Sequence, residues 1–317
     1  MQRLLVITPC LNAAHFLDDT IMSVVTQAGD FAVHYHVQDG GSHDDTVQKL
    51  ETWAKRLASD WPRLCTDLVF SFRSEPDEGL YDAINKGFAV AHDLPDNGMM
   101  TWINAGDRLA QGALQTVTAV RRQFADAEWL SGCFAQINNE GCPIVFGAPV
   151  AISAKAVAAG LHDGRRLGAL QQEGVFWSHG LWRKAGGCVN SKLKLAGDFD
   201  LWRRFARHSP CHVLHVATGF FRRHSGGLSS DVQRYCAEVD GLVTGPATSQ
   251  RDAALREFTE LVTRRDHNGL AKAGFLGPIV VWNWSTGGWE RKVALVDIPP
   301  NSSPTGEGQN TQTMRGQ

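Results

Sequence analysis

Acidic and amide side chains follow four apolar segments of the chain, at the point where each segment ends. The segments end in TPCLN at residues 8–12, DGGSHD at 39–44, SEPDEG at 74–79 and NAGD at 104–107. In an open α/β sheet, ligands bind beyond the carboxyl ends of the strands. If the four segments are parallel strands, their polar ends meet at one rim and form a candidate ligand site.

Asp39 is followed by two glycines, which allow the backbone to turn tightly and to approach a ligand closely. Asp44 can cap a helix that begins near Thr46, which leaves Asp39 facing the cleft. Its carboxylate could accept hydrogen bonds from a nucleobase or a ribose hydroxyl. It could equally satisfy backbone donors of an ordinary strand-to-helix turn. This turn alone leaves both roles open.

Asp107 follows an apolar segment and a glycine. One carboxylate in that place suits a hard divalent cation such as Mg²⁺ or Mn²⁺, which is held jointly with substrate phosphates. A helix N-cap is the alternative role. Lys86 lies four residues after Asp82, so its spacing fits a surface ion pair as well as a contact with phosphate.

Strands and amphipathic helices must position these side chains. Aliphatic and β-branched runs predict strands over residues 4–8, 32–38, 68–72 and 99–104. Apolar residues with helical spacing predict a helix in each gap between them. This alternation predicts an α/β fold with a mainly parallel sheet that is covered on both faces.

The pattern loosens beyond Asp107 and predicts a mixed α+β half. A helix is expected over residues 112–124, a strand near 129–137, and a turn at 138–141 that leads to residues 144–146. Residues 249–265 predict an amphipathic helix, and a segment with Trp282, Trp284 and Trp289 follows it. These tryptophans could lie at a membrane interface or pack onto the protein itself.

Composition excludes several classes of protein. The chain has 317 residues, of which 43% are hydrophobic and 20% charged, as in a folded globular protein. A formal net charge of -2 gives no overall attraction for nucleic acid. The seven cysteines form no C-x-x-C pair, which favours a reducing cytoplasm. No apolar run reaches the roughly 20 residues that span a bilayer.

Seven short motifs, taken in order, resemble the family 2 glycosyltransferases. They are ITPCLN, QDGGSHDDT, SEPDEGLYDAINKG, INAGD, QQEGVFW, LAGDFDLWRRF and FFRRHSGGLSS, between residue 3 and about residue 230. The resemblance implies a GT-A fold and inverting transfer of one sugar from a nucleotide-diphosphate sugar to a saccharide or lipid-linked saccharide acceptor. It is nearest to nonprocessive members that build bacterial capsule, exopolysaccharide or O-antigen, because the Q-x-x-R-W motif of processive members does not occur.

The resemblance also implies where the donor binds. The first strand end lies beside the nucleotide, the second contacts its base, and the third lies near its nucleoside. Basic groups near the diphosphate help to neutralise its charge. The residues that we expect to bind the donor are Thr8, Pro9, Asn12, Asp39, Asp77, Lys86, Asn104 and Arg223.

Residues 104–107 occupy the place of the family's D-x-D-type metal motif. Asp107 matches its metal-binding last Asp, and His224 matches a His that in several members reaches the metal or the diphosphate. A surface histidine is the alternative role for His224. Asn104 and Gly106 stand where many members have Asp, so we expect Mn²⁺ or Mg²⁺ to bind mainly as a complex with the donor diphosphate.

Asp198 matches the catalytic Asp of the family, which would take the proton from the acceptor hydroxyl. A helix N-cap is its alternative role, and Asp200 is the competing base. A nucleotide-sugar pyrophosphorylase is disfavoured because residues 9–12 do not form a Gly-rich basic loop. A noncatalytic nucleotide-sugar-binding or assembly subunit with the same fold stays open as the alternative function.

The motifs predict how the chain is organised. We expect a nucleotide-sugar-binding half over residues 1–107 and an acceptor and catalytic half of the same domain over residues 108–230. A helical extension is expected over residues 231–297 and a disordered tail over residues 298–317. The expected location is the cytoplasm, with peripheral contact at the inner face of the membrane through the extension.

Overall fold

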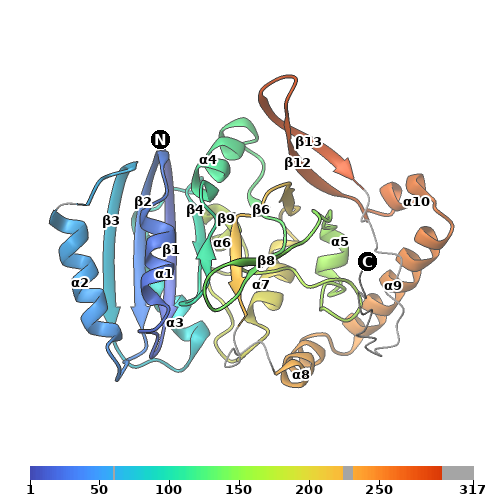
Figure 1. Cartoon of the computed structure of the whole chain (residues 1–317). Helices are drawn as coiled ribbons and strands as arrows, with labels where there is room; N and C mark the ends of the chain where they lie inside the picture. The colour runs from blue at the N-terminus through green and yellow to red at the C-terminus, as the bar shows by residue number, and fades with distance from the viewer. Residues whose placement is uncertain (60, 224–230, 295–317) are drawn as a thin grey trace, which may run out of the picture.

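A nine-stranded sheet forms the centre of the computed structural model, which describes residues 1–59, 61–223 and 231–294. The strand order is β13-β12-β10-β6-β9-β4-β1-β2-β3, and helices cover both faces of the sheet (Figure 1). The predicted GT-A-type α/β fold with a mainly parallel sheet is confirmed.

The four strands predicted in the first third of the chain are all present and run parallel to one another. In the sheet register, Cys10 is opposite Asp39 and Asp39 is opposite Ser74, so the ends of three strands share one edge. The elements are β1 (Gln2–Cys10), α1 (Leu17–Val25), β2 (Gly29–Asp39), α2 (Thr46–Ser59), β3 (Cys65–Ser74), α3 (Leu80–Phe88), the 3₁₀ helix η1 (Ala89–Asp93) and β4 (Met99–Trp102).

Strand β1 lies between two hydrophobic cores. Leu5 and Ile7 point to the core that contains α3, α6 (His179–Lys184) and α7 (Gly197–Phe205). Leu4 and Val6 point to the core that contains α1, α2 and α4 (Ala113–Gln123). Because neighbouring side chains of a strand point to opposite faces, a continuous apolar run is what a strand covered on both sides requires.

The middle of the chain is mixed, as predicted. The strand expected over residues 129–137 is divided between two sheets, because β6 joins the large sheet and β7 joins a small one of order β5-β11-β7-β8. The turn expected at residues 138–141 connects β7 to β8. The remaining elements are β5 (Arg108–Leu109), β6 (Trp129–Ser131), β7 (Ala135–Ile137), β8 (Pro143–Phe146), α5 (Ala154–Ala158), β9 (Val175–Ser178), β10 (His212–Leu214) and β11 (Gly219–Arg222).

The C-terminal segment contains the expected helices and, in addition, a hairpin that we did not predict. Helices α8 (Val232–Leu242), α9 (Pro246–Thr263) and α10 (His267–Lys272) agree with the expected helical extension. Strands β12 (Gly277–Asn283) and β13 (Gly288–Ala294) then extend the large sheet, since β12 pairs in parallel with β10. The β-branched run Ile279, Val280 and Val281 explains this strand. The tail predicted to be disordered, residues 298–317, lies outside the described residues.

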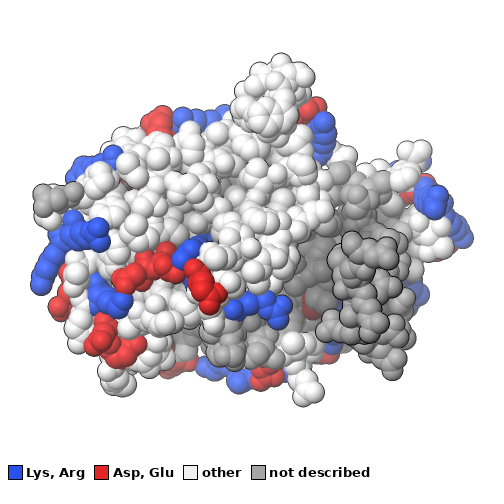
Figure 2. Space-filling view, in the orientation of Figure 1, with Lys and Arg blue, Asp and Glu red and all other residues white. Residues whose placement is uncertain are grey.

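Charge is distributed without one dominant sign on the face shown in Figure 2, where Lys and Arg lie among Asp and Glu. This agrees with the near-neutral net charge of the sequence. Within residues 1–59, 61–223 and 231–294, no helix has both the length and the apolar character needed to cross a bilayer.

Candidate active site

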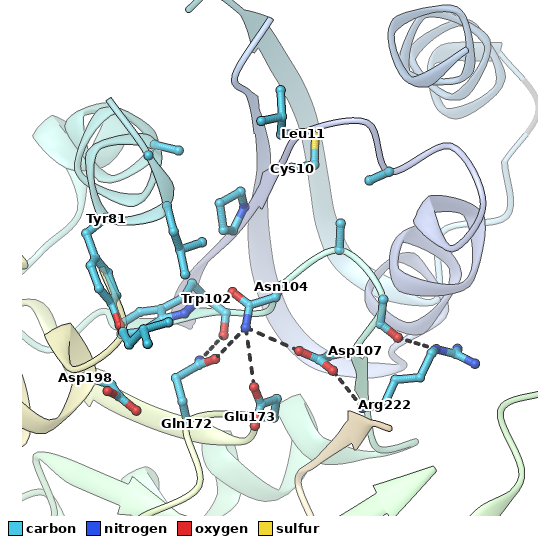
Figure 3. Close-up of a pocket in the computed structure, with 18 of the residues that line it drawn as sticks. Cys10, Leu11, Tyr81, Trp102, Asn104, Asp107, Gln172, Glu173, Asp198 and Arg222 are labelled. Carbon is cyan, nitrogen blue, oxygen red and sulfur yellow. Dashed lines mark hydrogen bonds between the residues drawn. The ribbon is translucent and has the colours of Figure 1, made fainter. Parts of the chain in front are cut away.

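A cavity of about 870 Å³ opens at the carboxyl ends of β1 and β4. Helices α3, α7 and α8 close its other sides, so both the first strands and the later helices contribute to it. Leu11 and Cys10 lie on one side of it, and Tyr81 and Asp198 lie on the other (Figure 3). Six residues predicted from the sequence line this cavity: Pro9, Asn12, Asp77, Asn104, Asp107 and Asp198.

Asp107 and Asn104 form a compact polar group at the end of β4. Asn104 Nδ2 lies 3.3 Å from Asp107 Oδ2 and 3.4 Å from Glu173 Oε1, and Asp107 Oδ1 accepts a hydrogen bond from Arg222 N at 2.8 Å. The turn between them needs Gly106, whose φ of 120° is unfavourable for other residues. Asp107 is only 5% exposed, so its oxygens face Asn104 and Glu173 rather than bulk water (Figure 3).

Arg222 supports this turn from behind. Its Nε donates to Gly106 O at 2.6 Å, its Nη2 donates to Asp19 Oδ2 at 2.8 Å, and its guanidinium lies over the Phe16 ring at 4.6 Å. The residue is 1% exposed. Arg222 therefore fixes the Asn104–Asp107 turn, and these contacts hold its charge inside the protein.

Glu173 is a site residue that we did not predict, although its QQEG motif had been recognised. It precedes β9, lines the cavity, and is hydrogen-bonded to Asp107. Burial and the neighbouring charge of Asp107 raise the pKa of Glu173 well above its usual value. Burial also raises the pKa of Asp107, to about 6, so the two carboxyl groups titrate as an interacting pair.

The residues at this turn fit a divalent cation. Asn104 Oδ1 is buried and, within the described part of the chain, has no hydrogen-bond partner, whereas Nδ2 of the same amide faces Asp107 (Figure 3). Carboxylate and amide oxygens are ligands that Mg²⁺ and Mn²⁺ accept. No group of three or more His, Cys, Asp or Glu among the described residues could hold a metal ion by itself. Oxygens from a second source, such as a diphosphate, would have to complete the coordination.

Replacing Glu173 by Gln should raise the thermal stability of the metal-free protein by a few degrees at pH 8. A carboxyl group whose pKa is raised by folding destabilises the folded state once the pH exceeds its unfolded pKa of about 4.3. The gain should therefore shrink as the pH is lowered to about 5. Thermal unfolding at both pH values checks this, with the half-exposed Glu257→Gln as control. A Glu173→Gln protein that is less stable than wild type at pH 8 would contradict it.

Asp198 lies in the first turn of α7 and faces the cavity. One of its oxygens, Oδ1, accepts a hydrogen bond from Phe199 N at 2.8 Å. Burial raises the pKa of Asp198 to about 6. Asp200 accepts instead from Arg204 Nε at 3.0 Å and is not among the described residues that line the cavity. The geometry therefore favours Asp198 over Asp200 as a base.

A second cavity of about 280 Å³ adjoins the first. The two share Asp198, Glu173 and Tyr235 in their linings, so Asp198 lies where they meet. The second cavity combines aromatic rings with side-chain amides, which suits a ligand with both apolar faces and hydroxyl groups. Its aromatic residues are Phe134, Phe199, Trp202, Phe221 and Tyr235, and its amide residues are Gln136, Gln171 and Gln172.

Asp39 is fully buried and is not among the described residues that line the cavity. Its carboxylate accepts hydrogen bonds from Gly41 N at 3.1 Å, from Ser42 N at 3.0 Å and from Ser74 Oγ at 2.6 Å. Burial raises its pKa, but the hydrogen bonds from Ser42, Ser74 and Gly41 outweigh this and lower it. This is the turn-stabilising role that we left open, and a direct contact with a base stays a prediction.

Other predicted donor-binding residues also lie outside the cavity lining formed by the described residues. Thr8 is buried, with its Oγ1 3.0 Å from Tyr35 Oη. Lys86 Nζ donates to Pro76 O at 2.8 Å and forms an ion pair with Asp82. Arg223 is exposed and donates its backbone N–H to Ile137 O. His224 lies outside the described residues.

Lys194 is a cation at the rim that we did not single out. It lines the cavity, and its Nζ donates to Glu78 O at 2.8 Å. Tyr81 and Tyr235 line the same cavity. Tyr81 belongs to the SEPDEGLYDAINKG motif, so the sequence contained a pattern from which this site residue could have been found. Lys194 and Tyr235 reach the cavity through tertiary contacts of α7 and α8, which no local pattern indicates.

The comparisons with known proteins concern the family and the fold of the chain. Residues 5–119 match the family described as glycosyl transferase family 2, so the family resemblance is confirmed. The matched segment begins within β1 and contains β2, β3, β4 and the Asn104–Asp107 turn. No curated protein sequence matches the chain.

Among solved structures, the fold is similar to TarS from S. aureus. TarS 1–349 in complex with UDP-GlcNAc has a TM-score of 0.54 and 17% identity, and the match covers 73% of this chain and 61% of that one. TarS has a TM-score of 0.53 and 14% identity, with 87% of this chain and 55% of that one covered. The chain thus matches about three fifths of the length of these structures, and the likeness shows a shared fold.

Proposed function

We propose that this chain, whose residues 5–119 belong to glycosyl transferase family 2, is an inverting glycosyltransferase. It moves one sugar from a nucleotide-diphosphate sugar to a saccharide or lipid-linked saccharide acceptor in bacterial surface polysaccharide synthesis. The single observation that carries this proposal is the position of Asp198, whose carboxyl group lies where two cavities meet.

The larger cavity is the site for the donor. It is formed at the carboxyl ends of β1 and β4, where ligands of α/β sheets bind. Pro9, Asn12 and Asp77 line it and are proposed to contact the nucleotide. The TarS structure of similar fold contains UDP-GlcNAc, which supports a nucleotide sugar as the class of donor. The proposed boundary at Asp107 separates this nucleotide-sugar-binding half from the acceptor half.

The smaller cavity is the site for the acceptor. Aromatic rings pack against the apolar faces of sugars, and the Gln side chains can hydrogen-bond to their hydroxyl groups. An acceptor in this cavity places a hydroxyl group beside Asp198. The carboxylate takes the proton as the acceptor oxygen attacks the anomeric carbon from the face opposite the diphosphate. This route needs a single base and gives inversion at that carbon.

The leaving diphosphate needs its charge neutralised. Asp107 and Asn104 are the residues that we propose to hold Mn²⁺ or Mg²⁺, with Glu173 beside them. When bound there, the cation supplies positive charge to the diphosphate oxygens. Lys194 supplies a further positive charge at the rim of the same cavity. His224 is proposed to act from the segment after β11.

The acceptor-dependent rate should rise with pH and level off above about pH 6. Asp198 acts as a base only when it is ionised, and burial raises its pKa to about 6. Below that pH, kcat/KM for the acceptor should fall about tenfold per pH unit. Steady-state rates at saturating donor and Mn²⁺ measure this profile. The pH range from about 4.5 to about 8 includes the pKa of Asp198. A rate that stays constant over this range would contradict the assignment of the base.

A panel of UDP, GDP and dTDP sugars, each with Mn²⁺ or Mg²⁺, tests the proposed donor class. A ligand that binds only the folded protein raises its melting temperature by mass action. We expect one class of nucleotide sugar to raise it, and the cation to enlarge the shift. No shift with any donor would contradict the proposal. A shift without sugar transfer to any acceptor would favour the noncatalytic binding or assembly subunit.

The hairpin β12–β13 is the proposed point of peripheral contact with the inner face of a membrane. Trp284 is 89% exposed and Trp282 is 40% exposed at the end of β12, where indole rings are available to a lipid headgroup region. In a flotation experiment, the full chain should rise with anionic liposomes. The double variant Trp282→Ala and Trp284→Ala should lose this binding. Equal flotation of both proteins would contradict the contact.

A further inference from the structure

We propose that Glu238 is a positioning residue for the base, because its carboxylate holds the backbone that leads into helix α7. This inference rests on the proposed role of Asp198. Glu238 lies on α8, in the segment that we expected to be a helical extension. This segment lies beyond the residues that match the family. The inference makes α8 a working part of the active site.

The contact consists of three backbone N–H groups that converge on one carboxylate. Lys194 N lies 3.0 Å from Glu238 Oε1, and Leu195 N and Ala196 N lie 2.9 Å and 3.0 Å from Oε2. The Glu238 side chain is 17% exposed, so these bonds are largely shielded from water. A carboxylate that accepts several backbone hydrogen bonds fixes the segment that donates them.

Helix α7 needs such a partner. Ala196 occupies its N-cap position, and a methyl side chain cannot accept a hydrogen bond from the first turn. Glu238 supplies negative charge at this end of the helix from a different element, where the helix dipole favours it. Asp198 lies two residues after Ala196, the last residue that Glu238 holds. The position of the Asp198 carboxyl group therefore depends on the position of this backbone. Lys194, at the rim of the donor cavity, lies on the same segment.

Helix α8 is firmly attached beside α7. Val239 and Val243 are buried against Ala196 and Phe199. On another side of α8, Asp240 accepts two hydrogen bonds from Arg165, at 2.9 Å from Nη1 and 2.8 Å from Nη2. The apolar contacts and this forked ion pair keep α8 in place independently of Glu238. A variant of Asp240 can therefore separate the attachment of the helix from the specific contact of Glu238.

The experiment compares Glu238→Ala, Glu238→Gln and Asp240→Asn with the wild type. Glu238→Ala should lower kcat by about 10- to 100-fold, since small misplacements of a catalytic group have effects of that size. Its dissociation constant for the donor should change less than kcat does, because Lys194 at the rim lies on the same segment, whereas Asp198 acts only in the chemical step. Glu238→Gln keeps one of the two oxygens in place and should retain an intermediate kcat. Asp240→Asn should lose thermal stability and keep its kcat within about threefold.

Hydrogen exchange gives a readout that does not depend on activity. The backbone amides of residues 194–196 should exchange faster in Glu238→Ala than in wild type or in Asp240→Asn. Equal exchange in all three proteins would overturn the inference. An unchanged kcat in Glu238→Ala would overturn it too, as would an equal loss of kcat in Asp240→Asn. Failure of the proposed function itself would be seen separately, as a wild-type protein that transfers no sugar.

Discussion

Replacing Asp198 by Asn or Ala should lower kcat by about 10²- to 10⁴-fold, the usual contribution of a general base. The dissociation constant for the donor should change little, because Asp198 lies at the junction with the acceptor cavity and away from the Asn104–Asp107 turn. Asn keeps the size of the side chain and can still accept the hydrogen bond from Phe199 N. Steady-state kinetics and donor calorimetry measure the two quantities.

Asp200→Asn is the matched control for this variant. Asp200 lies on the same helix, but it pairs with Arg204 and lies outside the cavity lining formed by the described residues. Its kcat should stay within about threefold of wild type, and its loss of stability should be small. Near-normal turnover in Asp198→Asn, or a larger loss in Asp200→Asn, would refute the assignment of the base.

Replacing Asp107 by Asn should weaken cation-dependent donor binding by at least about 100-fold. Loss of a partner that merely orients a metal ligand costs about 10- to 100-fold, so loss of the ligand itself should cost at least as much. The fold should survive, because an amide oxygen can still accept the hydrogen bond from Arg222 N. Donor titrations with and without Mn²⁺ measure the effect, and Asp30→Asn, in a surface ion pair with Arg122, is the control.

The same titrations test how the cation binds. The described residues supply few carboxylates, so the free protein should bind Mn²⁺ weakly and the donor should bring the remaining ligands. Tight binding of Mn²⁺ to the wild-type protein in the absence of donor would contradict this. Donor affinity that is equal with Mn²⁺ and with a chelator would contradict the role of Asp107.

Local sequence patterns predict the first half of the site because its residues follow strands. The register that places Cys10, Asp39 and Ser74 side by side results from parallel pairing, which periodicity indicates. The pattern does not say how deep each side chain lies. Asp39 and Thr8 are enclosed by their own neighbours, whereas Asn12 and Asp77 face the cavity.

The second half of the site is less predictable because distant segments form it. Glu173 and Asp107 lie far apart in the sequence, and only the fold brings these carboxyl groups together. Glu238 reaches the start of α7 in the same way. Strand β12 was missed because its apolar run follows helices and ends among tryptophans, for which we weighed a membrane interface or packing onto the protein but no strand.

The stereochemistry of the transferred sugar tests the central claim most directly. Wild-type protein would be incubated with the nucleotide sugar that stabilises it, Mn²⁺ and a saccharide acceptor, and the anomeric signals of the product would be followed by proton NMR from the first minutes. Asp198, as a single base at the junction of the two cavities, predicts release of one nucleoside diphosphate per product and an inverted anomeric configuration. A product that retains the configuration of the donor would contradict the account.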